Sequence, residues 1–60
     1  MFSLKFLTGN AAFSDGYGEQ EATRILANVA ERIMNGSTGG KVRDINGNTI
    51  GEWEFEIEWD

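Results

Sequence analysis

Five carboxylates alternate with four apolar side chains at the C-terminal end of the sequence. In a β-strand, residues two apart point to the same face and lie about 6.6–6.8 Å from each other, so these carboxylates would form one row. That spacing is similar to the spacing of successive phosphates along a nucleic-acid strand, and such a row would attract a basic protein surface. The acidic row, as we call it, consists of Glu52, Glu54, Glu56, Glu58 and Asp60.

A solvated sheet face explains the same row without any partner. An antiparallel sheet that is covered on one side leaves the other side in water, where charge keeps it soluble and blocks stray strand pairing. Lys5, Lys41 and Arg43 are expected across from the glutamates as cross-strand pairs. Because these three cations cannot neutralise five carboxylates, a net negative stripe remains under either interpretation.

Phe13 and Tyr17 are the other candidate contact residues. They lie in residues 9–18, which hold three glycines and should form a loop. This loop is longer than the usual connection of about 4–6 residues, which is a common feature of functional loops. We expect Phe13 to tuck under the fold as a plug at the rim of the core. The alternative is that Phe13 and Tyr17 form an apolar patch for a partner, next to the acidic row.

Catalytic, cofactor and metal sites are not predicted. The chain has no histidine and no cysteine, which removes the usual general bases, nucleophiles and zinc ligands. Asp44, Asn46 and Asn48 match the opening of a calcium loop, but Thr49 stands where that loop needs glycine and Phe55 where it needs glutamate. Residues 36–41 resemble a phosphate loop in composition only, because the spacing differs and the segment leads into a strand. The sequence therefore predicts a protein that is not an enzyme.

The charge balance favours a protein partner. Ten acidic against five basic residues give a net charge of −5, which repels nucleic acid and anionic membranes and attracts basic protein surfaces. We expect neither direct nucleic-acid binding nor a membrane span, and the absence of an export signal predicts a cytoplasmic protein. A chain of sixty residues buries a small core, so a homodimer or higher homo-oligomer is expected to add stability.

Two periodicities define the first half of the chain. Phe2, Leu4 and Phe6 alternate with polar residues, which predicts a strand. From Glu19 to Asn35 the apolar residues instead recur at helical spacing, and Gly36 follows as a stop signal. The expected buried face of this helix consists of Ala22, Ile25, Leu26, Val29, Ile33 and Met34.

The second half predicts a β-hairpin. Residues 41–44 and 50–59 read as strands on either side of Asn46-Gly47, which is the strongest short hairpin signal. A two-residue turn would place Val42 opposite Gly51. A three-residue loop with Gly47 in the left-handed conformation would pair Val42 with Ile50, and we prefer it because it matches two apolar residues. That register also needs a bulge at Gly51-Glu52, because Ile50 and Trp53 cannot otherwise share a face.

The order of these elements predicts one α+β domain over residues 1–60. The helix must cover one face of a three-stranded antiparallel sheet, which gives a two-layer β-α-β-β sandwich. We expect the last strand in the centre, flanked by the first and second strands. Its apolar row should lie under the helix and consists of Trp53, Phe55, Ile57 and Trp59.

Three short segments resemble a group of very short proteins common in bacteriophage genomes. The segments are residues 10–13 (NAAF), residues 22–26 (ATRIL) and residues 43–53 (RDINGNTIGEW), and in the group they read DNAAF, ARIL and D-x-NGN-x-VG-x-W/F. The resemblance covers most of the chain, although the glutamate-rich tail after Trp53 is longer than in the group. It implies a phage origin and no catalytic or binding residues.

Two functional hypotheses follow from the residues and the resemblance together. The first is a non-enzymatic, phage-encoded binding protein that inhibits a host defence or nucleic-acid-processing protein in the bacterial cytoplasm. Its contact surface would be the acidic row, with Phe13 and Tyr17. The second is an accessory protein of phage structure or assembly that acts by homo-oligomerisation through an apolar rim and an open sheet edge.

Overall fold

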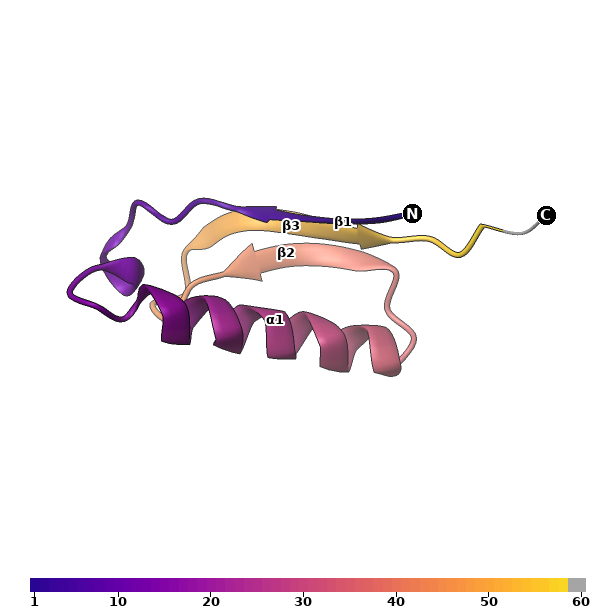
Figure 1. Ribbon diagram of the computed structural model, residues 1–60. Helices are drawn as coiled ribbons and strands as arrows, with labels where there is room; N and C mark the ends of the chain where they lie inside the picture. Colours follow the sequence, from indigo (N-terminus) through magenta and orange to yellow (C-terminus); the bar gives the residue numbers. More distant parts are fainter. Residues whose placement is uncertain (59–60) are drawn as a thin grey trace.

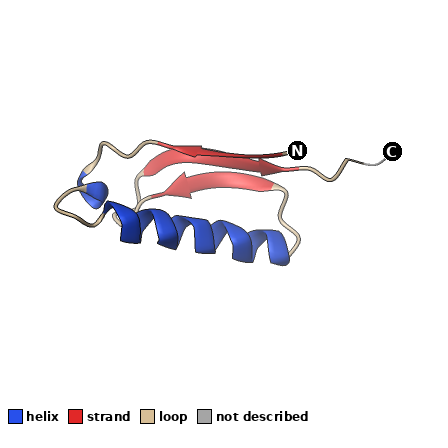
Figure 2. Cartoon of the chain, in the orientation of Figure 1, coloured by secondary structure: helices blue, strands red, loops and turns tan. Residues whose placement is uncertain are grey.

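The protein forms a two-layer α+β fold, and the computed structural model describes residues 1–58. The elements are β1 (Phe2–Phe6), the 3-10 helix η1 (Ala11–Phe13), α1 (Gly18–Met34), β2 (Gly39–Arg43) and β3 (Thr49–Phe55). The sheet order is β1-β3-β2, both pairings are antiparallel, and α1 runs along one face of the sheet (Figures 1 and 2). The predicted fold class, with the last strand in the centre, is confirmed.

Helix α1 lies within one residue of the predicted range at each end. Asn35 closes it, and the N–H groups of Gly36 and Ser37 then donate to the carbonyls of Ile33 and Arg32, which is the pattern of a Schellman stop. The buried line of the helix differs from the predicted face. Glu21, Ile25 and Val29 are buried at a spacing of four residues, whereas the predicted core residues Leu26 and Met34 are exposed.

This rotation of the buried line has a polar cause. Glu21 begins the line and is buried because the hairpin loop and a neighbouring arginine satisfy its carboxylate. The flank of α1 that carries Leu26 lies away from the core, and this side chain is 52% exposed. The prediction that Leu26 and Met34 belong to the core is therefore wrong, because apolar periodicity does not register a buried carboxylate that has partners.

The hairpin has the predicted loop but a different bulge. Asp44 and Asn48 close a loop of residues 45–47, and Gly47 has a φ of 85°, the left-handed conformation that glycine adopts without strain. Val42, however, lies opposite Gly51, and the next residue, Arg43, lies opposite Thr49. Ile50 is therefore the extra residue of the bulge, so both the predicted Val42–Ile50 pair and the predicted bulge position are wrong.

The bulge determines which residues of β3 enter the core and which lie at the centre of the sheet. It turns Ile50 toward α1, on the face that Trp53 also occupies, and the two side chains are 9% and 3% exposed. Gly51 is then left between β1 and β2, where a Cβ atom would lie 2.6 Å from Cα and 2.7 Å from Cβ of Phe6. Only a glycine allows this approach of the backbones.

The core is one small cluster between the layers. Its buried members are Ile25, Val29, Val42, Ile50 and Trp53, and partly buried side chains surround it. Phe13 is one of these: its ring stacks on Phe6 with 5.9 Å between ring centroids, so the predicted plug is confirmed.

Strand β3 is shorter than predicted. It ends at Phe55, because its last pairs with β1 and β2 are Phe2–Phe55 and Gly39–Glu54. Beyond this point Ile57 is 56% exposed, so its predicted place under the helix is wrong. The predicted core residue Trp59 and the last member of the acidic row, Asp60, lie outside the described residues.

Candidate functional site

The first half of the acidic row lies on the sheet face that α1 leaves uncovered. Lys5 of β1 and Lys41 of β2 are both opposite Glu52, as predicted, and Nζ of Lys41 lies 3.5 Å from a carboxylate oxygen of Glu52. Glu54 has the uncharged residues Ser3 and Gly39 opposite it. The two glutamates therefore differ: one is bracketed by cations and the other faces solvent with its charge uncompensated.

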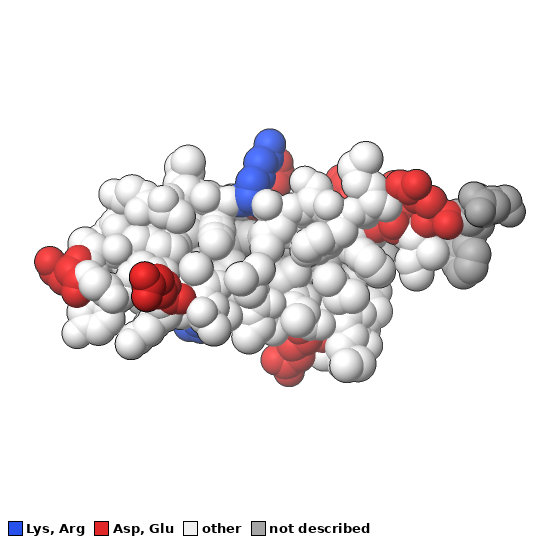
Figure 3. Space-filling model, viewed as in Figure 1, with Lys and Arg blue, Asp and Glu red and all other residues white. Residues whose placement is uncertain are grey.

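The second half of the row lies beyond the strand. Glu56 exchanges backbone hydrogen bonds with Met1, which extends the pairing of β1 and β3 by one position. The carboxylate of Glu58 accepts the N-terminal ammonium group at 2.8 Å. Figure 3 shows acidic side chains gathered at this end of the molecule, where the chain leaves β3.

The acidic row is thus uneven in charge. Glu52 and Glu58 each have a cationic partner, whereas within residues 1–58 no cation lies within ion-pair distance of Glu54 or Glu56. The predicted cross-strand role of Arg43 is wrong, because the bulge places this residue opposite Thr49. The carboxylates of Glu54 and Glu56 are therefore the ones in the described row without a cationic partner, although the N-terminal ammonium group also donates to the backbone carbonyl of Glu56.

Phe13 and Tyr17, the aromatic candidates for partner contact, do not lie near Glu54 and Glu56. The loop that carries η1 lies at the opposite end of the molecule from the end of β3 (Figure 1). Phe13 is half-buried against the core, whereas Tyr17 is 60% exposed. Tyr17 and the exposed Ile45 line a hollow of about 470 Å³ beside the start of α1. Of the predicted pair, only Tyr17 offers an accessible surface, and it is separate from Glu54 and Glu56.

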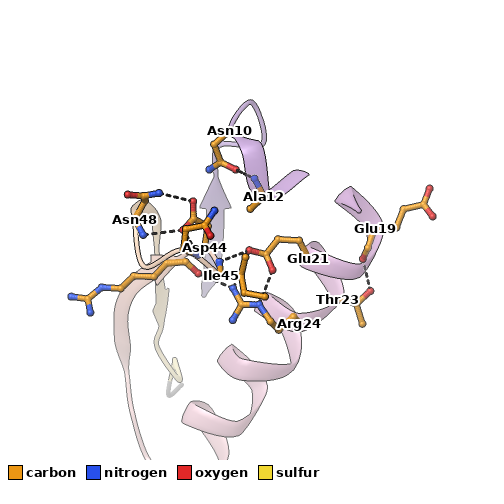
Figure 4. Close-up of polar contacts among 11 residues, drawn as sticks. Asn10, Ala12, Glu19, Glu21, Thr23, Arg24, Asp44, Ile45 and Asn48 are labelled. Carbon is orange, nitrogen blue, oxygen red and sulfur yellow. Dashed lines mark hydrogen bonds and ion pairs between the residues drawn. The ribbon is translucent and has the colours of Figure 1, made fainter. Parts of the chain in front are cut away.

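A buried polar network was missed by the sequence analysis (Figure 4). Two nitrogens of Arg24, Nε and Nη2, donate to the two carboxylate oxygens of Glu21 at 2.6 and 3.1 Å. The backbone N–H of Ile45 donates to the same carboxylate at 2.7 Å, and Nη2 of Arg24 also donates to the carbonyl of Arg43 at 3.0 Å. The network fixes the hairpin loop to the first turns of the helix.

Asp44 organises the loop itself. Its carboxylate accepts the backbone N–H groups of Asn46 and Asn48, both at 2.9 Å, and the side-chain amide of Asn48 at 3.1 Å. These bonds show that Asp44 shapes the hairpin loop through Asn46 and Asn48. Within residues 1–58, no group of three or more acidic side chains is placed to hold a metal ion.

Both buried carboxylates are held in their charged form. The hydrogen bonds from Arg24 keep the pKa of Glu21 below its usual value and outweigh the effect of burial. Burial alone would raise the pKa of Asp44, but the bonds from Asn48 and Asn46 together lower it. Since every oxygen involved already accepts a hydrogen bond within the fold, these carboxylates hold the hairpin loop in place.

One sequence signal could have revealed this network. Glu21 lies four residues before Ile25 and eight before Val29, which puts it on the same face of the helix, and Arg24 follows at the spacing of a helical ion pair. An acidic residue on the buried face of a helix, at ion-pair spacing from an arginine, predicts that its carboxylate also accepts a hydrogen bond from another part of the fold.

No protein-family model matches the chain, and no curated protein or solved structure matches it. None of the helices in the described part of the chain is long and apolar enough to cross a membrane.

Proposed function

We propose that this chain is a non-enzymatic protein-binding module that contacts a basic protein surface through its acidic row. One observation carries the proposal: Glu54 and Glu56 are exposed and without cationic partners among residues 1–58, next to a sheet face that α1 leaves open. An uncompensated negative surface steers and orients a basic partner. Glu52 and Glu58 extend the same surface on either side, and Asp60 continues it in sequence.

The spacing of the row and the resemblance to short phage proteins both favour a partner that binds nucleic acid. Glu52 and Glu54 lie at strand spacing in β3, and the pairing of Glu56 with Met1 continues it by one position, so these three carboxylates would imitate the charge repeat of a nucleic-acid backbone. A phage-encoded module of this kind would occupy a basic groove on a host protein that processes nucleic acid, such as a defence nuclease, and would inhibit it by occupation. This proposal assigns no catalytic group to the chain itself.

Charge reversal with a matched control tests the proposal. The protein, joined to its tag by a long neutral linker, is used to recover partners from a bacterial lysate, and the affinity for the recovered protein is then measured. We expect Glu54→Lys with Glu56→Lys to weaken binding at least tenfold, and binding by the unmodified chain to weaken as salt is raised. The double variant Glu19→Lys with Glu31→Lys makes the same change of net charge on exposed positions of α1 and should bind almost normally. Equal loss in the two double variants would overturn the proposal.

An assembly role through homo-oligomerisation is the second candidate. Met1, Phe2 and Ile57 are exposed at the end of the molecule where β1 begins and β3 ends, and within residues 1–58 the outer strands β1 and β2 each pair with a neighbour on one side only. Light scattering at low and physiological salt separates the two candidates. Self-association through these apolar side chains should persist at both, whereas the acidic row needs a basic partner and should give no self-association of its own.

A further inference from the structure

The two outer strands of the sheet differ in how their outer edges are protected. Strand β2 lies next to α1 (Figure 1), and two arginines of the helix reach it. Nη2 of Arg24 donates to the backbone carbonyl of Arg43 at 3.0 Å, and Nη1 of Arg32 lies 3.1 Å from the Cβ position above Gly40. The side chains of Lys41 and Arg43 are exposed, and such charges discourage the addition of another strand. The outer edge of β2 is therefore guarded by cations.

The outer edge of β1 is open within residues 1–58. At the two ends of this strand, Met1 exchanges backbone hydrogen bonds with Glu56, and the N–H of Leu7 donates to the carbonyl of Ile50. Because the bonding groups of an antiparallel strand alternate, the even-numbered residues between Met1 and Leu7 direct their N–H and C=O groups away from β3. These residues are Phe2, Leu4 and Phe6. In the described chain, no other segment hydrogen-bonds to their backbone groups.

The segment from Met1 to Leu7 is self-complementary when it pairs antiparallel with its own copy. Centred on Leu4, the pairing would place this residue opposite Leu4 of a second copy and Phe2 opposite Phe6. Both pairs join residues whose backbone groups point outward, so each pair would exchange both of its N–H···O=C hydrogen bonds. The apolar side chains of these residues would also meet, on the face of the sheet that packs against the helix.

The exposed side chains of the segment fit the same register. Met1 would lie opposite Leu7 of the second copy, and these side chains are 74% and 73% exposed in the single chain. Phe2, which would meet a phenylalanine, is 50% exposed. Ser3 would lie opposite Lys5, so no like charges would face each other. The pairing would therefore cover three large apolar side chains that the single chain leaves in water.

Other registers of the same pairing are less favourable. A shift by one residue would place the outward-pointing groups of one strand opposite residues that already bond to β3. A shift by two residues in one direction would place Lys5 opposite Lys5 of the second copy, which is a repulsive pair. The same shift in the other direction would place Lys5 opposite the apolar Met1. The register centred on Leu4 avoids all three defects.

We infer that β1 pairs with β1 of a second copy to form a homodimer with one continuous sheet. The strand order would be β2-β3-β1-β1-β3-β2, with both helices on the same face. A chain of sixty residues has a small core, and pairing with a copy adds burial that the single chain lacks. The inference rests on self-association, the second candidate function, and names the strand through which it occurs. It does not depend on binding by the acidic row.

Cysteine cross-linking tests the register, because the chain has no cysteine of its own. Directly opposite residues of an antiparallel pair have Cβ atoms about 4.5–5.5 Å apart, close enough for a disulfide after a small adjustment. An equimolar mixture of Ser3→Cys and Lys5→Cys should form a mixed disulfide under mild oxidation. In the control mixture, Ser3→Cys is combined with Ala27→Cys, which lies at an exposed position of α1, and cross-linking should be about tenfold slower.

Light scattering and sedimentation of the full chain measure the dimer itself. Since each copy has a net charge of −5, we expect dimerisation to be unchanged or strengthened as salt is raised. Ser3→Lys would face Lys5 of the second copy and should raise the dimer Kd about tenfold. Combining it with Lys5→Glu makes the facing charges opposite and should recover the dimer. Ala27→Lys makes the same change of net charge on α1 and should change the Kd less than about twofold.

Three results would overturn the inference. The first is a monomer at every concentration tested, and the second is equal cross-linking in the two cysteine mixtures. The third is a dimer that survives Ser3→Lys but is lost in Ile57→Ser, which would leave self-association to the exposed end of β3 and keep the second candidate without this inference. The cysteine mixtures also decide the matter if Ser3→Lys is poorly folded.

Discussion

The carboxylate of Glu21, in the first turns of α1, accepts the backbone N–H of Ile45 in the hairpin loop at 2.7 Å. These residues are 24 positions apart, and their bond joins the two layers at the end where the helix begins. A charged side chain thus joins the helix to the sheet, a role that apolar contacts usually have in so small a domain. Its burial is tolerated because Arg24 and the loop occupy both of its oxygens.

Replacing Glu21 by Gln should destabilise the protein. The variant keeps the size of the side chain but loses the charge-assisted bonds to Arg24, and such bonds contribute about 1.5–3 kcal/mol. We expect the free energy of unfolding, measured with urea, to fall by about 2 kcal/mol. Glu19→Gln changes an exposed residue of the same first turn and should cost less than about 1 kcal/mol. Equal effects of the two substitutions would contradict the role given to Glu21.

Stability should decrease in acid because of the two buried carboxylates. Glu21 and Asp44 have a lower pKa in the folded protein than in the unfolded chain, where the values are about 4.3 and 3.9. A depressed pKa contributes stability above the unfolded value, and this contribution is lost as pH falls through the folded value. Urea unfolding between pH 7 and pH 2.5 should show a plateau above about pH 5 and a decline below it. Glu21→Gln should have a shallower decline; an identical slope would exclude Glu21 as a source.

Gly51→Ala should be severely destabilising. The new methyl group would meet the backbone and side chain of Phe6, and neither can move without disturbing the sheet. Overpacking of this kind costs about 1–3 kcal/mol, and more where backbone is involved. Gly9→Ala is the matched control, because nothing lies within 4 Å of its Cβ position. Urea denaturation of both variants checks the prediction, and a neutral Gly51→Ala would show that the strands are not packed so closely.

Asp44→Ala should loosen the hairpin loop. Three hydrogen bonds to Asn46 and Asn48 depend on its carboxylate. We expect a lower Tm and faster amide exchange at Asn46 and Asn48 than in Asn46→Ala, which removes an exposed side chain of the same loop. If Asn46→Ala lowers the Tm as much as Asp44→Ala, the loop does not depend on this carboxylate.

Phe13 and Tyr17 should separate in their effects on stability. Phe13 stacks on Phe6 at the rim of the core, so Phe13→Ala should cost about 2 kcal/mol, less than the 3–5 kcal/mol of a fully buried phenylalanine. Tyr17 is 60% exposed, and Tyr17→Ala should change stability by less than about 0.5 kcal/mol. Thermal unfolding of the two variants checks this, and a larger loss in Tyr17→Ala would contradict the assignment.

Much of the fold could be predicted from local patterns. The helix bounds, the left-handed Gly47 and the three-residue loop each depend on a few neighbouring residues, and each agrees with the structure. The central place of β3 also follows from the order and length of the strands. The bulge was misplaced because apolar matching of Val42 and Ile50 was given priority. The structure instead places Gly51 between β1 and β2, and the bulge turns the side chain of Ile50 into the core.

The candidate sites were predicted less completely. The acidic row is visible as alternation, but the pairing of Glu58 with the N-terminal ammonium group joins residues 57 positions apart, which no local pattern shows. The network of Glu21, Arg24 and Ile45 likewise joins α1 to the hairpin loop across 24 positions of the sequence. The register of the sheet determines which glutamate has a lysine opposite it on the neighbouring strand and which has an uncharged residue there.

The sequence by itself determined the types of the elements, their order and the sign of the surface charge, because periodicity and composition are local properties of the chain. Only the tertiary structure decided that Glu21 is buried, that Leu26 is exposed and that β3 ends at Phe55. It also decided that, within residues 1–58, the carboxylates of Glu54 and Glu56 have no cationic partner. The physical reason is that burial and charge pairing depend on contacts between distant segments, and the packing of α1 on the sheet determines these contacts.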